Sequence, residues 1–293
     1  MNNDNTVILI VSGGFADQLR YYRIGKSLES FYNKKVLYDI SWYEKCGMDN
    51  IKLNKRNFEL LNIFNDLDFN VYDVNVIEEN ISYYNFFNFV NKSIDKSQFL
   101  NVINNTKCIE GILIFEEKNT NIISECGEKL KLSDVLKLLN YNEILNLDKY
   151  FINILNDDNK ILCDDIINTE NSIALHIRRT DYIYSRLYTD IDINYYKEAI
   201  DIIQNKVNDK VKVFLFSDDL NWVKENIIPS IENIYDYKIA DINDNERGYF
   251  DFYLISKCQY QISSSGSFCK VAYQFNSFKN KILITPDNIK DLL

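Results

Sequence analysis

The 293-residue chain is poor in the residues that interrupt regular structure and in the residue that most often carries acid–base chemistry. It contains 8 Gly, 2 Pro and a single His. So few glycines and prolines exclude a collagen-like or low-complexity chain. A histidine-rich metal site or a Ser–His–Asp hydrolase is also disfavoured, because either would have to use the one histidine, His176. Instead of a metal ligand or a catalytic base, His176 can be a half-buried structural histidine on a strand.

Targeting and membrane-spanning signals are missing as well. The N-terminus has no basic region, and its apolar run over 7–11 is too short for a signal peptide. No stretch approaches the ~20 apolar residues of a transmembrane helix. The six cysteines are scattered without a C-x-x-C pair, which disfavours structural zinc and disulfides and favours reduced thiols. We therefore expect a cytoplasmic protein, and peripheral contact with a membrane stays open.

Basic residues are in the minority. The chain has 33 Lys and Arg against 43 Asp and Glu, a net charge of −10. Non-specific nucleic-acid binding needs a surplus of Lys and Arg facing phosphates, so no nucleic-acid partner is expected, although one local basic pocket is not excluded. A chain of this length predicts two domains or one large one, with enough core to fold without staples.

The N-terminal part begins with a βαβ pattern, which implies a parallel sheet. Apolar periodicity predicts a strand over 6–11, a helix over 17–31 after a glycine turn, and a strand over 35–40. Residues 50–165 are expected to be mostly helical, with helical spacing over 128–139 and 142–155.

The C-terminal part alternates strands and helices more clearly. Strands are expected over 172–177, 211–216, 260–262 and 281–285, and helices over 194–204, 220–226, 250–256 and 268–275. The polar stretch 156–171 is the expected seam. We therefore predict an N-terminal acceptor-side domain, 1–165, and a C-terminal nucleotide-sugar (donor) domain, 166–293.

Four predicted strands end in unusual polar or glycine segments: 12–14, 176–179, 217–219 and 263–267. In open α/β sheets, ligands bind outside the carboxyl ends of the strands. Four such ends predict a site at the tops of two sheets that face each other across a cleft.

Arg178 and Arg179 are the strongest candidates for an anion site. Both are permanently charged, and the planar guanidinium suits a bidentate phosphate contact. In a chain of net charge −10, two adjacent arginines suggest an anionic ligand. The alternative is a structural network with Asp181.

The other segments have weaker signals, each with a structural alternative. Small side chains before the helix at Phe268 suit phosphate oxygens, or Ser265 or Ser267 caps that helix. Glycines 13 and 14 permit close approach of a ligand, or merely a tight turn. Of Asp218 and Asp219, one is expected to accept from a nucleobase or ribose and the other to cap a helix.

Two D-x-D strings, Asp66–Asp68 and Asp190–Asp192, are the pattern with which some transferases hold a metal. Neither follows a convincing strand, and 43 acidic residues produce such strings by chance. No metal site is expected.

Longer strings surround these segments. They read GGFADQ at 13–18, HIRRTDY at 176–182, FSDDLNW at 216–222 and DFYLISKC at 251–258, the last leading into the serine stretch. In this order they resemble the α-1,2-fucosyltransferases of glycosyltransferase family 11, which have GGLGNQ, HIRRGDY, FSDDxxW and DxYLMSxC. The likeness covers residues 6–30 and 172–288.

The resemblance implies a GT-B-like α/β fold of two Rossmann-like domains, and an inverting, metal-independent transfer of fucose from GDP-fucose to a glycan of a surface polysaccharide. No cofactor is implied beyond this donor substrate, and the partners are the donor and an oligosaccharide acceptor. The alternatives are another nucleotide-sugar donor, or a non-catalytic member that binds nucleotide or glycan.

By carry-over, Arg178 or Arg179 neutralises the departing pyrophosphate, which lowers the barrier. Several residues depart from the family motifs: Asp17 replaces an asparagine, Thr180 replaces a glycine, and Lys270 and Val271 stand where the family has paired tryptophans. Asp17 is a candidate base, with a helix cap as its alternative, and Lys270 could contact phosphate. The predicted catalytic residues are Asp17, Arg178 and Arg179, and the predicted donor-binding residues are Gly13, Gly14, His176, Arg178, Arg179, Asp218, Asp219, Ser265, Gly266, Ser267 and Phe268.

Overall fold

A computed structural model describes residues 6–45, 47–48, 55–72, 136–183, 191–244 and 246–292. The chain forms two compact units, an N-terminal unit of residues 1–48 and 55–145 and a C-terminal unit of residues 49–54 and 146–293. Parallel strands joined by helices confirm the α/β class predicted from the sequence.

The N-terminal unit is built on the predicted βαβ motif. Strand β1 (Thr6–Ile10) pairs in parallel with β2 (Lys35–Asp39) through helix α1 (Phe15–Tyr32). Within its described residues, the unit also has three short helices: α2 (Trp42–Lys45), α3 (Leu60–Ile63) and α7 (Tyr141–Ile144). Apolar side chains on the inner face of α1, such as Leu19, Ile24 and Leu28, are fully buried, which explains why α1 lies on the two strands.

The C-terminal unit holds a five-stranded, all-parallel sheet in the order β5-β4-β3-β6-β7. Its strands are β3 (Ser172–Ile177), β4 (Lys212–Ser217), β5 (Asp236–Ile239), β6 (Tyr260–Ser263) and β7 (Ile282–Ile284). Strand β3 is central and buried at every position. Because the strands are parallel, all their carboxyl ends lie at one edge of the sheet.

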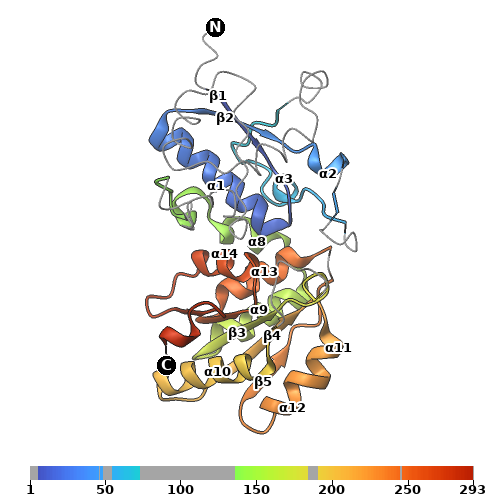
Figure 1. Ribbon diagram of the computed structural model, residues 1–293, viewed down its shortest axis with the longest axis vertical. Coiled ribbons are helices and arrows are strands. Elements are labelled where there is room, and N and C mark those ends of the chain that lie inside the picture. Colours follow the sequence, from blue (N-terminus) through green and yellow to red (C-terminus); the bar gives the residue numbers. More distant parts are fainter. Residues whose placement is uncertain are drawn as a thin grey trace, which may run out of the picture. The chain divides into compact units, whose positions relative to one another are not determined.

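Helices cover both faces of this sheet (Figure 1). On one face lie α10 (Ile193–Val207) and the consecutive helical turns α11 (Leu220–Trp222), η3 (Val223–Ile227) and α12 (Ile228–Ile231). On the other face lie α9 (Asp157–Asn168), α13 (Gly248–Lys257) and α14 (Phe268–Phe275). Two further elements complete the unit, α8 (Leu147–Ile154) and the final turn η4 (Ile289–Asp291).

Three sequence-based expectations need correction. The helical periodicity over 142–155 belongs to two helices, α7 and α8, because the Asn146 side chain accepts from two backbone N–H groups and begins α8. The expected seam at 156–171 is largely helix α9, which lies within the C-terminal unit and packs against α13. Strand β5 was not expected. The periodicity over 128–139 falls mostly outside the described residues, and residues 136–139 are not helical.

Along the chain, the two compact units meet between Leu145 and Asn146, whereas the domain boundary expected from the sequence lies at 165/166. The difference arises because α8 and α9 pack on α13, which belongs to the C-terminal unit. Among the described residues, no helix is long and apolar enough to cross a membrane. In the same part of the chain, Cys163, Cys258 and Cys269 are buried free thiols, and the other cysteines lie outside it.

Candidate functional site

The carboxyl ends of β3 and β6 are joined by a single serine. His176 lies in register with Ser263, and the backbone N–H of Ser264 continues the ladder by donating to the carbonyl of His176 at 2.9 Å. The Ser264 hydroxyl then accepts from the backbone N–H of Arg178 at 3.0 Å. These bonds fix where the chain leaves β3, and so where the two arginines begin.

The Arg178 side chain is held between two carboxylates. Its Nε and Nη2 each lie 2.8 Å from Asp181 Oδ1, and its Nη1 lies 3.1 Å from Asp218 Oδ2. Burial alone would lower the pKa of Arg178, but the carboxylates of Asp218 and Asp181 outweigh it and the pKa is raised. The network with Asp181 that the sequence offered as an alternative is therefore present, extended by Asp218.

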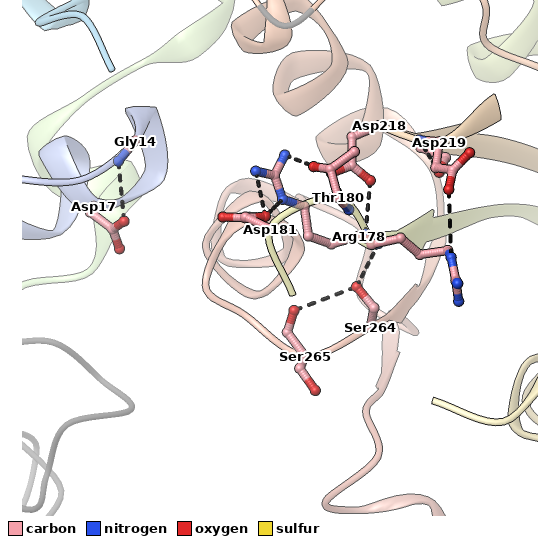
Figure 2. Close-up of polar contacts among 11 residues, drawn as sticks. Gly14, Asp17, Arg178, Thr180, Asp181, Asp218, Asp219, Ser264 and Ser265 are labelled. Carbon is pink, nitrogen blue, oxygen red and sulfur yellow. Dashed lines mark hydrogen bonds and ion pairs between the residues drawn. The ribbon is translucent and has the colours of Figure 1, made fainter. Parts of the chain in front are cut away.

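Asp218 contacts the turn that follows β3, as the dashed lines in Figure 2 show. Its Oδ1 accepts from the backbone N–H of Arg179 at 2.8 Å, and its Oδ2 accepts from the backbone N–H of Thr180 at 3.2 Å. The Thr180 hydroxyl donates to the same Oδ2, which also pairs with Arg178. The Asp218 side chain is 5% exposed. This carboxylate therefore ties the end of β4 to three consecutive residues after β3.

Arg179 has a different environment from its neighbour. Its guanidinium carbon lies 3.9 Å from the centre of the Trp222 ring, and its Nε lies 3.7 Å from Asp219 Oδ2. Asp219 begins α11 by accepting from the backbone N–H of Trp222 at 3.1 Å. The expectation that one of the two aspartates caps a helix is confirmed for Asp219. The same helical turn therefore positions both the carboxylate and the ring that contact Arg179.

His176 is a buried polar residue near the carboxyl end of β3. Its ring stacks on Phe268, with centroids 5.2 Å apart and an interplanar angle of 23°. Its Nδ1 is buried and makes no hydrogen bond with any residue that the structure describes. The pKa of His176 is lowered from 6.5 to about 4, mainly by burial; nearby Asp218 opposes this shift and nearby Arg178 adds to it. The imidazole is therefore neutral at physiological pH, and its buried Nδ1 has no hydrogen-bond partner among the described residues.

The serine segment turns sharply before α14. Gly266 has φ +117°, a conformation that residues with a Cβ rarely adopt, and a Cβ there would overlap the Tyr182 hydroxyl. Ser267 occupies the N-cap position of α14 but makes no side-chain capping bond, and Ser265 receives a hydrogen bond at its carbonyl from the Ser264 hydroxyl. The first N–H groups of α14 face the carboxyl edge of the sheet, a favourable place for an anion.

The glycine motif begins α1 in the N-terminal unit. Gly13 has φ +84°, and its carbonyl accepts from the Tyr43 hydroxyl at 3.0 Å. Asp17 caps the helix: its Oδ2 accepts from the backbone N–H of Gly14 at 3.3 Å, while its Oδ1 pairs with Arg20 at 3.2 Å. The structural alternative for Asp17 is thus present, and its part as a base stays a prediction.

The remaining acidic and basic candidates have ordinary surface contacts. Asp68 pairs with Lys26 at 2.8 Å, and Asp192 begins α10 by accepting from a backbone N–H. Asp190 lies outside the described residues. Lys270 lies 3.4 Å from Asp287 on the surface. Within the described ranges, no group of three His, Cys, Asp or Glu side chains could hold a metal.

The C-terminal unit therefore gathers most of the predicted site at one sheet edge, and the N-terminal unit carries the rest at the start of α1. The edge residues are His176, Arg178, Arg179, Asp218, Asp219 and the segment 265–268. Sequence reasoning missed the contacts of Thr180 and Trp222 and the position of Tyr182 against Gly266. The spacing of Asp219 and Trp222, typical of a helix cap, could have placed the ring near the arginines.

An α/β protein with a parallel sheet, and with two arginines held against aspartates at the carboxyl ends of its strands, is the class that this fold and this site define. Within that class the sequence model of glycosyl transferase family 11 matches residues 145–291, half of the chain. The chain belongs to this family, which confirms the resemblance found in its motifs. It is accordingly an enzyme of the glycosyltransferase type, similar to fucosyltransferases.

Two relatives from Escherichia coli are similar to this chain. The O-antigen biosynthesis glycosyltransferase WbnK is 31% identical over 157 residues, which span 52% of this chain and 48% of WbnK. The chain thus matches about half the length of that relative. An alpha-1,2-colitosyltransferase is 23% identical over 285 residues, which span 96% of this chain and 91% of the relative.

Solved structures of fucosyltransferases are more distant. NodZ alpha-1,6-fucosyltransferase soaked with GDP-fucose is 14% identical with a TM-score of 0.46, covering 93% of this chain and 92% of NodZ. POFUT1 in complex with GDP is 10% identical with a TM-score of 0.41, covering 97% of this chain and 99% of POFUT1.

Proposed function

We propose that the chain is an inverting, metal-independent glycosyltransferase that moves fucose from GDP-fucose to a hydroxyl group of a glycan acceptor in an α-1,2 linkage. The proposal includes a GT-B-like arrangement, with the donor bound by the C-terminal part and the acceptor by the N-terminal part. The observation that carries it is the pair of guanidinium groups, Arg178 and Arg179, at the carboxyl edge of a parallel sheet in a chain of net charge −10.

The chemistry follows from charge. When the bond between the sugar and the diphosphate breaks, negative charge builds on the β-phosphate, and preorganised positive charge lowers the barrier. The carboxylates of Asp181 and Asp218 hold the Arg178 side chain in place, so folding has already positioned it before the donor binds. The Arg179 guanidinium lies over the Trp222 ring, which holds it close to the end of β4. The nucleoside contact of His176 stays part of this proposal; its imidazole is neutral, and its buried Nδ1 has no hydrogen-bond partner among the described residues.

Inversion by direct displacement needs a base near the acceptor hydroxyl. Asp17 is the proposed base, as the carboxylate in the first turn of α1 after the Gly13–Gly14 turn. Its contacts to Gly14 and Arg20 keep the carboxylate at a fixed place. The acceptor is proposed to be a surface polysaccharide unit, since a relative is named for O-antigen biosynthesis.

A second donor has specific support. The relative that matches 96% of the chain is named an alpha-1,2-colitosyltransferase. Colitose is fucose without its 3-hydroxyl group, so both donors share the nucleotide and most of the sugar. This alternative keeps the same fold, the same arginines and the same linkage.

A donor-by-acceptor screen with mass detection tests the proposal. The arms are GDP-fucose, GDP-colitose, a UDP-sugar and an ADP-sugar, each with galactose-terminated oligosaccharides, with and without EDTA. We expect transfer from one GDP-sugar, undiminished by EDTA, and a product whose anomeric configuration, read by NMR, is inverted relative to the donor. Transfer from the UDP-sugar alone would contradict a guanine-nucleotide donor. Retention of the anomeric configuration would contradict a mechanism of direct displacement.

A matched pair of variants tests the part of the arginines. Arg179→Met removes the guanidinium at the sheet edge, whereas Arg247→Met removes an exposed arginine of the same unit that pairs with Asp244 at 3.0 Å. We expect a loss of about a hundredfold or more in kcat/KM for Arg179→Met, as for a removed transition-state donor, and little change for Arg247→Met. Equal activity of the two variants would contradict the proposal.

A further inference from the structure

The Asp218 carboxylate is buried and is occupied by the turn that follows β3. An ionised carboxylate offers about four lone-pair positions. Asp218 accepts from four donors: Oδ1 from the N–H of Arg179, and Oδ2 from the N–H and the hydroxyl of Thr180 and from Nη1 of Arg178. With a side chain that is 5% exposed and already holds these four donors, Asp218 offers little surface to a nucleobase or ribose hydroxyl.

We infer that Asp218 is a positioning residue: it sets the backbone turn and the side chain of Arg178, and so the place of both arginines, without touching the donor. This inference rests on the proposed diphosphate site and deepens it. The two backbone bonds hold Arg179 and Thr180 against the end of β4, and the ion pair holds Arg178 against the same carboxylate. One side chain therefore holds both the guanidinium of Arg178 and the backbone from which the Arg179 side chain extends.

Thr180 is the second half of the device. Its hydroxyl donates to Asp218, at a place where the motif of the related enzymes has a glycine, which has no side chain to donate. The threonine thus adds a donor that fastens the turn in this chain. The Ser264 hydroxyl fixes the other end of the same turn through the N–H of Arg178. The turn is held at both ends, by β6 on one side and by the residue after β4 on the other.

A carboxylate that positions arginines and one that binds the nucleoside differ in a measurable way. A positioning residue affects every ligand that the arginines bind, whatever else that ligand carries. A nucleoside contact affects only ligands with a nucleoside. GDP and inorganic pyrophosphate share the diphosphate and differ in the nucleoside, so the ratio of the two effects separates these functions.

The experiment measures the dissociation constants of GDP and inorganic pyrophosphate by calorimetry for the unmodified protein, Asp218→Asn, Thr180→Val and Thr180→Ser. We expect Asp218→Asn to weaken both ligands by the same factor, about tenfold to a hundredfold, the effect of one or two charge-assisted hydrogen bonds. Thr180→Val, which keeps the shape but lacks the hydroxyl, weakens both by about threefold to tenfold. Thr180→Ser restores both affinities because it keeps the donor.

Asp165→Asn is the matched control. Asp165 also accepts from two cations, Lys212 and Lys238, at 2.7 and 2.8 Å, but Lys212 begins β4, at the end opposite Asp218. This variant should bind both ligands as the unmodified protein does. If Asp218→Asn does not fold, Thr180→Val carries the same comparison, because it removes one donor and leaves the carboxylate paired.

Three outcomes overturn the inference. Loss of GDP binding with unchanged pyrophosphate binding would make Asp218 a nucleoside ligand. Unchanged affinity for both ligands in Asp218→Asn and Thr180→Val would show that the arginines need no such support. Binding of neither ligand by the unmodified protein would remove the proposed diphosphate site itself, and this result is distinct because it appears before any substitution is made.

Discussion

The two adjacent arginines should differ sharply in what they contribute to folding. Arg178→Met removes a guanidinium that lies between Asp181 and Asp218, whose side chains are 13% and 5% exposed. Arg179→Met removes one that stacks on Trp222 and has a carboxylate, 31% exposed, at 3.7 Å. We expect Arg178→Met to lower the free energy of unfolding by much more than Arg179→Met.

The magnitudes follow from these surroundings. Removing one partner of a buried ion pair costs about 3–5 kcal/mol, because the remaining charge is left in a poorly solvated place. For Arg178 we expect about 3 kcal/mol, the lower end, since Asp218 keeps its three other donors. For Arg179, a cation–π contact contributes about 0.5–1 kcal/mol and a long, partly exposed ion pair adds little, so about 1 kcal/mol is expected.

Urea denaturation at pH 7, followed by tryptophan fluorescence and by circular dichroism, measures both values. Circular dichroism is the primary signal, because Trp222 lies against Arg179 and its fluorescence will change for local reasons. Equal destabilisation by the two substitutions would refute the reasoning, since it would mean that the two carboxylates around Arg178 are solvated in solution. Arg247→Met, at an exposed pair with Asp244, should change the free energy of unfolding by less than about 0.5 kcal/mol.

Two glycine substitutions test close approaches in the two units. Gly25→Ala should destabilise the protein by about 1–3 kcal/mol, because the new methyl group overlaps the Tyr38 hydroxyl between α1 and β2; the double variant with Tyr38→Phe should recover part of the loss, and no recovery would contradict that cause. Gly266→Ala should weaken GDP binding and lower the melting temperature, because its φ is +117° and the methyl group meets the Tyr182 hydroxyl. Gly248→Ala is the control, since no heavy atom lies within 4 Å of its new methyl group, and a similar loss there would argue against strain at Gly266.

The segments at the carboxyl ends of the strands were predictable, because they depend on local signals in the sequence. The strand expected over 172–177 is β3 at the same residues, and the helix expected over 268–275 is α14. In both, an apolar pattern meets an abrupt polar or glycine segment, which marks the end of the element without reference to the rest of the chain. The gathering of these segments then follows from parallel pairing alone.

Other features depended on partners far away in the sequence. The donors to Asp218 lie 38 and 39 residues before it, and nothing in the local pattern distinguishes a carboxylate that supports a turn from one that binds a ligand. Strand β5 was missed because it is an edge strand with no fully buried residue, and Asp236 and Lys238 interrupt its apolar pattern. Such strands are defined by pairing, here with β4, rather than by composition.

Two buried groups of the C-terminal unit give opposite pH dependences. His176 has a pKa lowered to about 4 by burial, and Asp251, whose Oδ1 accepts from Asn243 at 2.7 Å, has a pKa raised to about 7 by burial. Both groups are held in their neutral forms. The contribution of His176 to stability is complete above pH 6.5, where the unfolded chain is also neutral, and decreases as the pH falls toward 4. The contribution of Asp251 is complete below pH 3.8 and is lost as the pH rises through about 7.

Between pH 4.5 and 6.5 the two contributions therefore oppose each other, and the unmodified protein hides both. Asp251→Asn should make the free energy of unfolding rise more steeply with pH than in the unmodified protein, because only the histidine term remains of the pair. His176→Gln should make it rise less steeply or fall, and the double variant should return close to the original slope. Urea titrations at three pH values in this range measure the slopes, and all other titrating groups cancel in the differences. Parallel lines for the unmodified protein and both single variants would show that neither group is buried in its neutral form, and the neutral imidazole assigned to the nucleoside would lose its basis.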